Sequence, residues 1–93
     1  MREQIASFRS KKAANAAARV YGAYGITVYI SGPRKIKAYG PVYDLDTNEA
    51  GFKILTESKH VKAIIHGKAR AAAWRAVKNK EFDGKNWAAY YAI

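Results

Sequence analysis

The sequence predicts a small α+β fold in α-β-β-β-α order: an N-terminal helix, a three-stranded antiparallel sheet, a C-terminal helix and a short apolar tail. Three observations predict this class: two alanine-rich stretches, a β-branched and aromatic run between them, and a hydrophobic content of 49%. Alanine favours helices, whereas β-branched and aromatic residues favour strands. The hydrophobic content is too high for a disordered basic tail, so residues 1–93 are expected to form a single basic α+β domain.

The first helix is expected from about Glu3 to Tyr21, because this stretch is rich in alanine and has no proline or glycine before Gly22. On a helical wheel one side collects the expected core residues Ile5, Ala13, Ala16, Ala17, Val20 and Tyr24. Another side collects Phe8, Lys11, Lys12, Asn15 and Arg19. The helix is therefore expected to carry a basic stripe away from its core face.

The sheet is expected from the strand-like run at 26–30, after which Ser31-Gly32-Pro33 indicates a turn. Residues 34–39 alternate basic with apolar or aromatic side chains, Gly40-Pro41 interrupts them, and residues 42–45 resume the strand. The next segment has two interpretations. Residues 51–55 can be the returning strand of a hairpin, or residues 47–57 can form a short helix, because an acidic residue follows Asp46 three positions later.

The second helix is expected most firmly from Lys68 to Asn79, opened by Ser58 or Gly67, while residues 60–65 fit either helix or a further strand. One face of this helix carries Lys68, Ala71, Arg75 and Lys78, and the opposite face carries Ala69, Ala73, Ala76 and Val77. A second basic stripe results. The apolar tail at 87–93 is expected to pack back on the domain.

Charge is segregated along the chain, whose net charge is +10. Residues 1–43 hold eight basic residues and one acid, and residues 58–80 hold seven basic residues and no acid, whereas residues 44–57 hold four of the seven acids. A solvated surface normally mixes both signs, so fold stability gives no reason for this separation. The segregation indicates an anionic partner.

The expected function is non-catalytic binding of nucleic acid, DNA or RNA, through phosphates, with weak sequence selectivity and strong salt dependence. A tyrosine among Tyr29, Tyr39 and Tyr43 could also stack on a base. The candidate contacts are Lys11, Lys12, Asn15 and Arg19 in the first helix, Arg34, Lys35, Lys37 and Tyr39 in the basic strand, and Lys68, Arg70, Arg75 and Lys78 in the second helix.

An alternative function belongs to another class: a small inhibitor or accessory protein of the phage or mobile-element type, comparable to an anti-CRISPR protein. Such a protein would bind an acidic surface of a host enzyme or nucleoprotein complex. The small size and the abundant tyrosine and arginine fit this class as well, because both residue types are enriched in protein interfaces. Binding to purified nucleic acid separates the two functions.

Catalytic and cofactor chemistry finds little support in the sequence, so no enzyme activity, cofactor or metal is expected. Cysteine is absent, and His60 and His66 lack the i, i+4 spacing of a helical metal site. Asp44 and Asp46 could share one side of a strand as an acid/base pair, but acids flanking a turn are the better interpretation. No run reaches the roughly 18 apolar residues of a membrane span. A cytoplasmic location is therefore expected.

The expected order of elements is similar to that of the double-stranded RNA-binding domain. The segments that carry this resemblance are Ser31-Gly32-Pro33-Arg34, for the family's first strand loop, and residues 67–73, for the start of its last helix. The resemblance implies phosphate contacts by Lys68 and Arg70 and a groove contact by Arg34.

Overall fold

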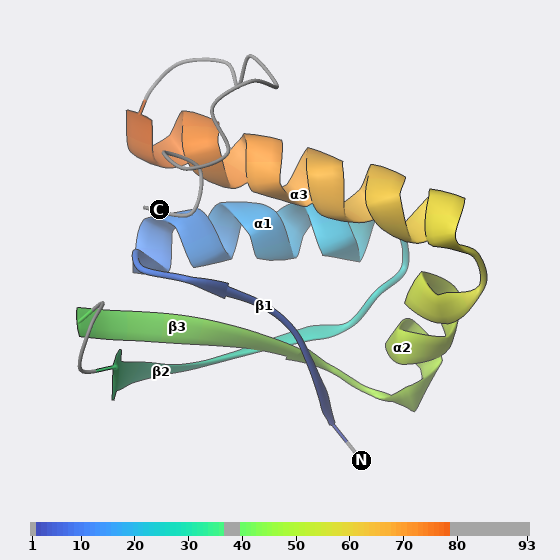
Figure 1. Ribbon diagram of the computed structural model, residues 1–93, viewed down its shortest axis with the longest axis horizontal. Coiled ribbons are helices and arrows are strands. Elements are labelled where there is room, and N and C mark those ends of the chain that lie inside the picture. Colours follow the sequence, from blue (N-terminus) through green and yellow to red (C-terminus); the bar gives the residue numbers. More distant parts are fainter. Residues whose placement is uncertain (1, 37–39, 79–93) are drawn as a thin grey trace.

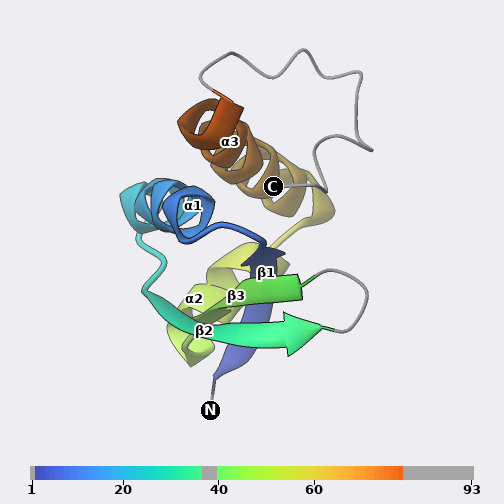
Figure 2. The same cartoon turned by 90° about the vertical axis from the view of Figure 1, so that its left-hand side faces the viewer.

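The computed structural model describes residues 2–36 and 40–78 and has an α+β fold. Its elements are β1 (Glu3–Phe8), α1 (Lys11–Ala23), β2 (Val28–Ile36), β3 (Gly40–Thr47), α2 (Glu49–Thr56) and α3 (Lys59–Lys78). The antiparallel sheet has the order β1-β3-β2. Helices α1 and α3 run side by side in opposite directions over one face of this sheet, and α2 lies at its end (Figures 1 and 2). The predicted α+β class and three-stranded antiparallel sheet are confirmed.

The order of elements along the chain differs from the predicted one, because residues 3–8 form a strand and not the start of a helix. β1 pairs with the central strand β3, with Glu3 opposite Thr47 and Phe8 opposite Tyr43. The helix begins at Lys11 because the Ser10 side chain caps it, accepting from the backbone N–H groups of the second and third helical residues. A strand therefore precedes the first helix, which departs from the helix-first order of the double-stranded RNA-binding domain.

Residues 49–56 form α2, so the hairpin strand predicted at 51–55 is wrong and the alternative of a short helix at 47–57 is confirmed. The Asn48 side chain caps this helix and accepts from the Gly51 N–H at 2.9 Å. Ser58 does the same for α3, accepting from the Val61 N–H at 3.0 Å. Residues 60–65 are accordingly helix and not strand.

The core holds α1 and α3 together through alanines. Ala13, Ala14 and Ala17 of α1 and Ala69 and Ala73 of α3 are fully buried, and larger side chains, Phe8, Tyr21, Ile26, Leu45, Leu55, Ile65 and Trp74, complete the cluster. Small side chains on both helices permit a close approach of their backbones. Two predicted placements are wrong: Phe8 is buried in β1 and Tyr24 is 36% exposed.

The predicted turn at residues 31–33 lies inside β2, where the pairing with β3 is irregular between Ser31 and Arg34. Gly32 has φ +124°, and a Cβ at this position would lie 2.8 Å from the carbonyl oxygen of Val42. This position therefore requires glycine. The predicted contacts Lys37 and Tyr39 and the apolar tail at 87–93 lie outside the described residues.

Candidate nucleic-acid interface

Helices α1 and α3 contain three and six lysines and arginines, respectively, and no acid. The exposed cations of α1 and those from the middle of α3 to its C-terminal end, together with an exposed asparagine, form what we call the cationic helix face: Lys11, Lys12, Asn15, Arg19, Lys68, Arg75 and Lys78. The acids among the described residues lie elsewhere, on β1, on β3, and on or directly after α2. All seven residues of the face were predicted from the sequence.

The basic stripes of the two helices adjoin each other. Lys68 and Arg75 are seven residues apart and so project from the same side of α3, next to the buried alanines that pack on α1. Lys68 reaches the neighbouring helix, because its Nζ lies 5.8 Å from the ring centroid of Tyr24, the C-cap residue of α1. Both helices also lie on the same side of the sheet (Figure 2).

The predicted contact Arg70 lies on a different side of α3. Its charge opposes the rise in the pKa of the buried Tyr21 and, after burial, contributes to the fall in the pKa of the half-buried His66. Arg70 itself is only partly exposed. At 100° per residue it lies roughly 160° around α3 from Lys68, so it is not part of the cationic helix face.

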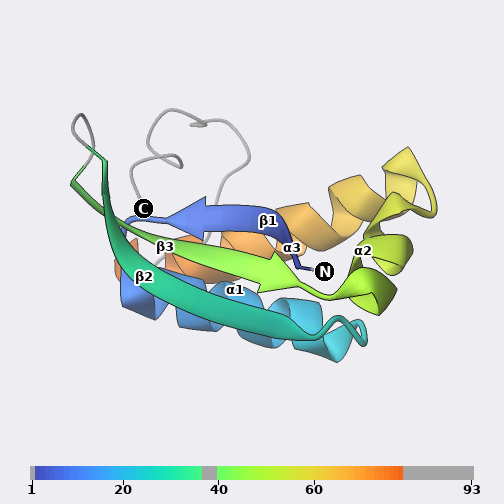
Figure 3. The ribbon, with the colours of Figure 1, turned by 90° about the horizontal axis from the view of Figure 1, so that it is seen from below.

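Arg34 points to the open face of the sheet, where it pairs with Asp44. Its Nε donates to Asp44 Oδ2 at 2.9 Å and its second nitrogen, Nη2, donates to Oδ1 at 3.1 Å. The carboxylate also accepts from Ser7 Oγ at 2.6 Å and from Gln4 Nε2 at 3.3 Å. Figure 3 shows that this face lies opposite the helices. Arg34 is thus engaged on the far side of the sheet, while its neighbour Lys35 is exposed.

The same contacts define the state of Asp44, one member of the acid pair singled out in the sequence. The hydrogen bonds from Arg34 and Ser7 and the charge of Arg34 lower the pKa of Asp44, against the effect of burial. Asp44 is 8% exposed and Asp46, two residues on, shares its side of β3. Four donors from β1 and β2 therefore hold the Asp44 carboxylate in its ionised form, and these hydrogen bonds connect β3 to its two neighbouring strands.

The tyrosines divide between the core and the surface. Tyr43 packs against the core, and the ring of Tyr29 lies under the guanidinium of Arg2, 3.9 Å from its centroid. Neither joins the cationic helix face. The exposed tyrosine beside that face is Tyr24, which the helical wheel placed in the core. The signal that could have separated it is Gly25, a glycine of φ +80° that directly follows Tyr24, the C-cap residue of α1.

Tyr21 and His66 form a buried polar contact between α1 and α3, which the sequence did not indicate. The Tyr21 hydroxyl and His66 Nδ1 are 2.6 Å apart. Burial raises the pKa of Tyr21 to about 12, and burial with the charges of Arg70 and Lys62 lowers the pKa of His66. Both groups are therefore neutral near pH 7. Because the fully buried hydroxyl proton needs an acceptor, Tyr21 donates to Nδ1 and the ring proton of His66 resides on Nε2.

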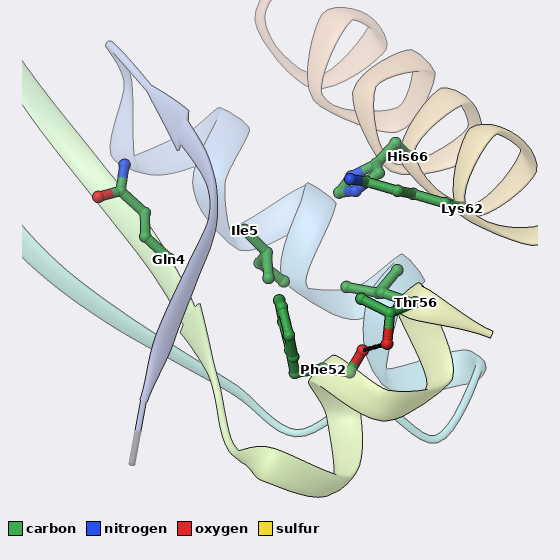
Figure 4. Close-up of a pocket in the computed structure, with 7 residues that line it drawn as sticks. Gln4, Ile5, Phe52, Thr56, Lys62 and His66 are labelled. Carbon is green, nitrogen blue, oxygen red and sulfur yellow. Dashed lines mark hydrogen bonds between the residues drawn. The ribbon is translucent and has the colours of Figure 1, made fainter. Parts of the chain in front are cut away.

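A cavity of about 90 Å³ opens beside His66, between β1, α2 and α3 (Figure 4). Apolar side chains from β1 and α2 form part of its wall, and His66 and Lys62 of α3 lie on its other side. The lining residues are Gln4, Ile5, Phe52, Leu55, Thr56, Lys62 and His66. This cavity is on the side of α3 away from Lys68 and Arg75.

Across the described ranges no group of three or more histidine, cysteine or acidic residues is placed to hold a metal ion. In the same part of the chain, no helix combines the length and apolar character needed to cross a membrane. Comparison with protein-family models, with curated proteins and with solved structures finds no match for this chain.

Proposed function

We propose that this protein binds nucleic acid through its phosphates, using the cationic helix face of α1 and α3. The observation that carries the proposal is the pairing of two acid-free helices on one side of the sheet, with their exposed cations on adjoining surfaces. An anionic polymer can contact both rows of cations at once. Each neutralised phosphate releases condensed counterions, which favours binding.

The rest of the described surface favours this orientation of the partner. The open face of the sheet carries Asp44 and Asp46, and the region of α2 carries Glu49 and Glu57. The carboxylates of Asp46, Glu49 and Glu57 repel phosphates, so they direct an anionic polymer toward the helices. Arg34 adds little to this attraction, because Asp44 compensates its charge.

The extent of the face gives the expected salt dependence. At 1.5 Å per residue, Lys11 to Arg19 spans roughly 12 Å and Lys68 to Lys78 roughly 15 Å. Such a length covers roughly four phosphates of one duplex strand, which rise 3.4 Å apiece. With about five phosphates neutralised over both helices, duplex affinity should fall roughly 500-fold between 50 and 200 mM salt. Contacts of this kind carry little sequence information.

The test is a fluorescence-anisotropy titration of nuclease-treated protein with labelled single- and double-stranded DNA and RNA at several salt concentrations. Two double variants remove the same charge. Lys12→Gln with Arg19→Gln lies on the cationic helix face, whereas Lys53→Gln with Lys59→Gln changes exposed lysines outside it. We expect the first variant to bind about tenfold or more weakly with a shallower salt slope, and the control to bind within about threefold of the parent.

Equal losses in both double variants would show that net charge, and not this face, attracts the polymer. Binding that does not depend on salt would contradict phosphate contacts. Failure to bind any of the four polymers, combined with specific retention of one acidic host protein, would replace the proposal with the inhibitor function and leave the same face as its interface.

A further inference from the structure

The cavity between β1, α2 and α3 combines an apolar wall with hydrogen-bond donors. Phe52, Ile5 and Leu55 supply apolar atoms, and Phe52 is 40% exposed, which is unusual for a side chain of this size. Figure 4 shows the Phe52 ring lying along the cavity beside Ile5. An apolar group that enters the cavity would cover this ring and remove its surface from water.

The side of the cavity formed by α3 offers two hydrogen-bond donors, His66 and Lys62. His66 Nε2 carries the ring proton, because Nδ1 accepts from Tyr21, and Lys62 lies one helical turn before His66. Both side chains extend toward the same end of the cavity (Figure 4). The Thr56 hydroxyl is occupied, donating to the backbone carbonyl of Phe52 at 2.9 Å. No carboxylate lines the cavity, so the ligand must bring the acceptor and the negative charge.

We propose that this cavity binds a small organic monocarboxylate. Its carboxylate accepts hydrogen bonds from Lys62 Nζ and His66 Nε2, and its short apolar group packs on Phe52 and Leu55. The volume of about 90 Å³ limits the size of the ligand. A single buried water needs roughly 10–15 Å³ of such space, so the cavity has room for a headgroup with a few carbons. This site is separate from the cationic helix face and does not depend on the proposed function.

An aliphatic acid fits the site better than inorganic phosphate does. Phosphate would place polar oxygens against Ile5, Phe52 and Leu55, where no donor is available to them. A branched short-chain acid such as isovalerate instead places its carboxylate against the donors of α3 and its alkyl group against the apolar wall. A neutral amide of the same shape keeps the apolar contact and loses the charge.

The test is an NMR titration of the full chain with sodium isovalerate, isovaleramide and inorganic phosphate at constant ionic strength. We expect saturable shifts centred on Phe52, Leu55 and His66 with isovalerate, and binding at least about fivefold weaker with the amide and with phosphate. Linear, non-saturating shifts with isovalerate would overturn the proposal. Amide or phosphate binding as tight as that of isovalerate would overturn it as well.

Two variants locate the ligand. Lys62→Gln should weaken isovalerate binding by about fivefold, the loss expected for one partly exposed charge-assisted hydrogen bond. Lys53→Gln is the matched control, since it removes the same charge from neighbouring α2 at a residue that does not line the cavity. Phe52→Ala should weaken isovalerate binding more than acetate binding, because only isovalerate has the apolar group. Equal effects of Lys62→Gln and Lys53→Gln would place the ligand elsewhere.

Discussion

The hydroxyl of Tyr21 and Nδ1 of His66 lie 2.6 Å apart, and the hydrogen bond between them joins the last turn of α1 to the middle of α3. The two rings meet edge to face, with centroids 5.6 Å apart and an interplanar angle of 78°. Tyr21 is fully buried, so water cannot replace the bond. The packing of α1 against α3 therefore depends in part on this one hydrogen bond.

Tyr21→Phe should lower the free energy of unfolding by about 1–2 kcal/mol, because it leaves Nδ1 of the half-buried His66 without its donor. Urea denaturation measures the change. Tyr24→Phe is the control, since that exposed ring has no hydrogen bond of this kind among the described residues and its replacement should change stability by less than about 0.5 kcal/mol. Equal stability of Tyr21→Phe and the parent would contradict the hydrogen bond.

The stability of the protein should fall as the pH drops below 6.5. Burial first, and then the charges of Arg70 and Lys62, lower the pKa of folded His66 below its ordinary value of 6.5. The unfolded chain therefore takes up a proton before the folded chain does, and the folded state loses stability until the pH passes the folded pKa. Tyr21 is neutral throughout this range, since its pKa is about 12.

Unfolding measured between pH 7.5 and pH 5 tests this dependence through its slope. His66→Gln should flatten the slope in this window, whatever its effect on stability at pH 7.5. His60→Gln, which replaces the exposed histidine of the same helix, is the matched variant for comparison. A slope that persists in His66→Gln would assign the titration to another group.

The sequence predicted the elements whose signals are local. Alanine content located α1 from Lys11 onward and the centre of α3, and the run at 26–30 located the start of β2. Residues 3–8 were misassigned because their helix and strand signals are similar, and pairing with β3, some 40 residues away, decides the outcome. Residues 49–56 were assigned to a hairpin strand because the turn residues before them also fit a hairpin. The helix found there begins at the cap that the Asn48 side chain provides.

The same contrast holds for the candidate site. The stripes on α1 and α3 follow from the helical period, so their members could be named in advance. The role of Arg34 could not, because it depends on a strand register that sets Ser7 opposite Asp44 and Arg34 opposite Val42, two residues before Asp44. The contact between Tyr21 and His66 likewise arises only when the two helices pack.

Asp44→Asn should reduce the loss of stability that occurs in acid. The Arg34 and Ser7 hydrogen bonds hold the pKa of folded Asp44 below its ordinary value of 3.8. This carboxylate therefore stabilises the fold above pH 3.8, and the contribution disappears as the pH falls through the lower folded pKa.

Acid titration followed by circular dichroism measures that contribution. The asparagine variant should be less stable at pH 7 by about 1–2 kcal/mol and should lose less stability than the parent below pH 4. Asp46→Asn is the control, as Asp46 shares the strand but not the ion pair with Arg34. Identical acid profiles for the parent and Asp44→Asn would contradict the role of the pair.

Two glycine substitutions in helices should change stability in opposite directions. Gly67 in α3 has nothing within 4 Å of an added Cβ, so Gly67→Ala should raise the free energy of unfolding by about 0.5–1 kcal/mol, because alanine restricts the unfolded chain.

Gly51 in α2 is buried, and an added Cβ would collide with the Thr47 hydroxyl and lie 2.9 Å from Ile26 Cγ2. That hydroxyl is held in place by its bond to the Thr27 carbonyl at 2.7 Å. Gly51→Ala should therefore cost about 1–3 kcal/mol despite the same gain in helix propensity. Thermal or urea unfolding of both variants gives the two signs, and a stabilising Gly51→Ala would show that α2 does not pack on Thr47 and Ile26 as closely as the structure has it.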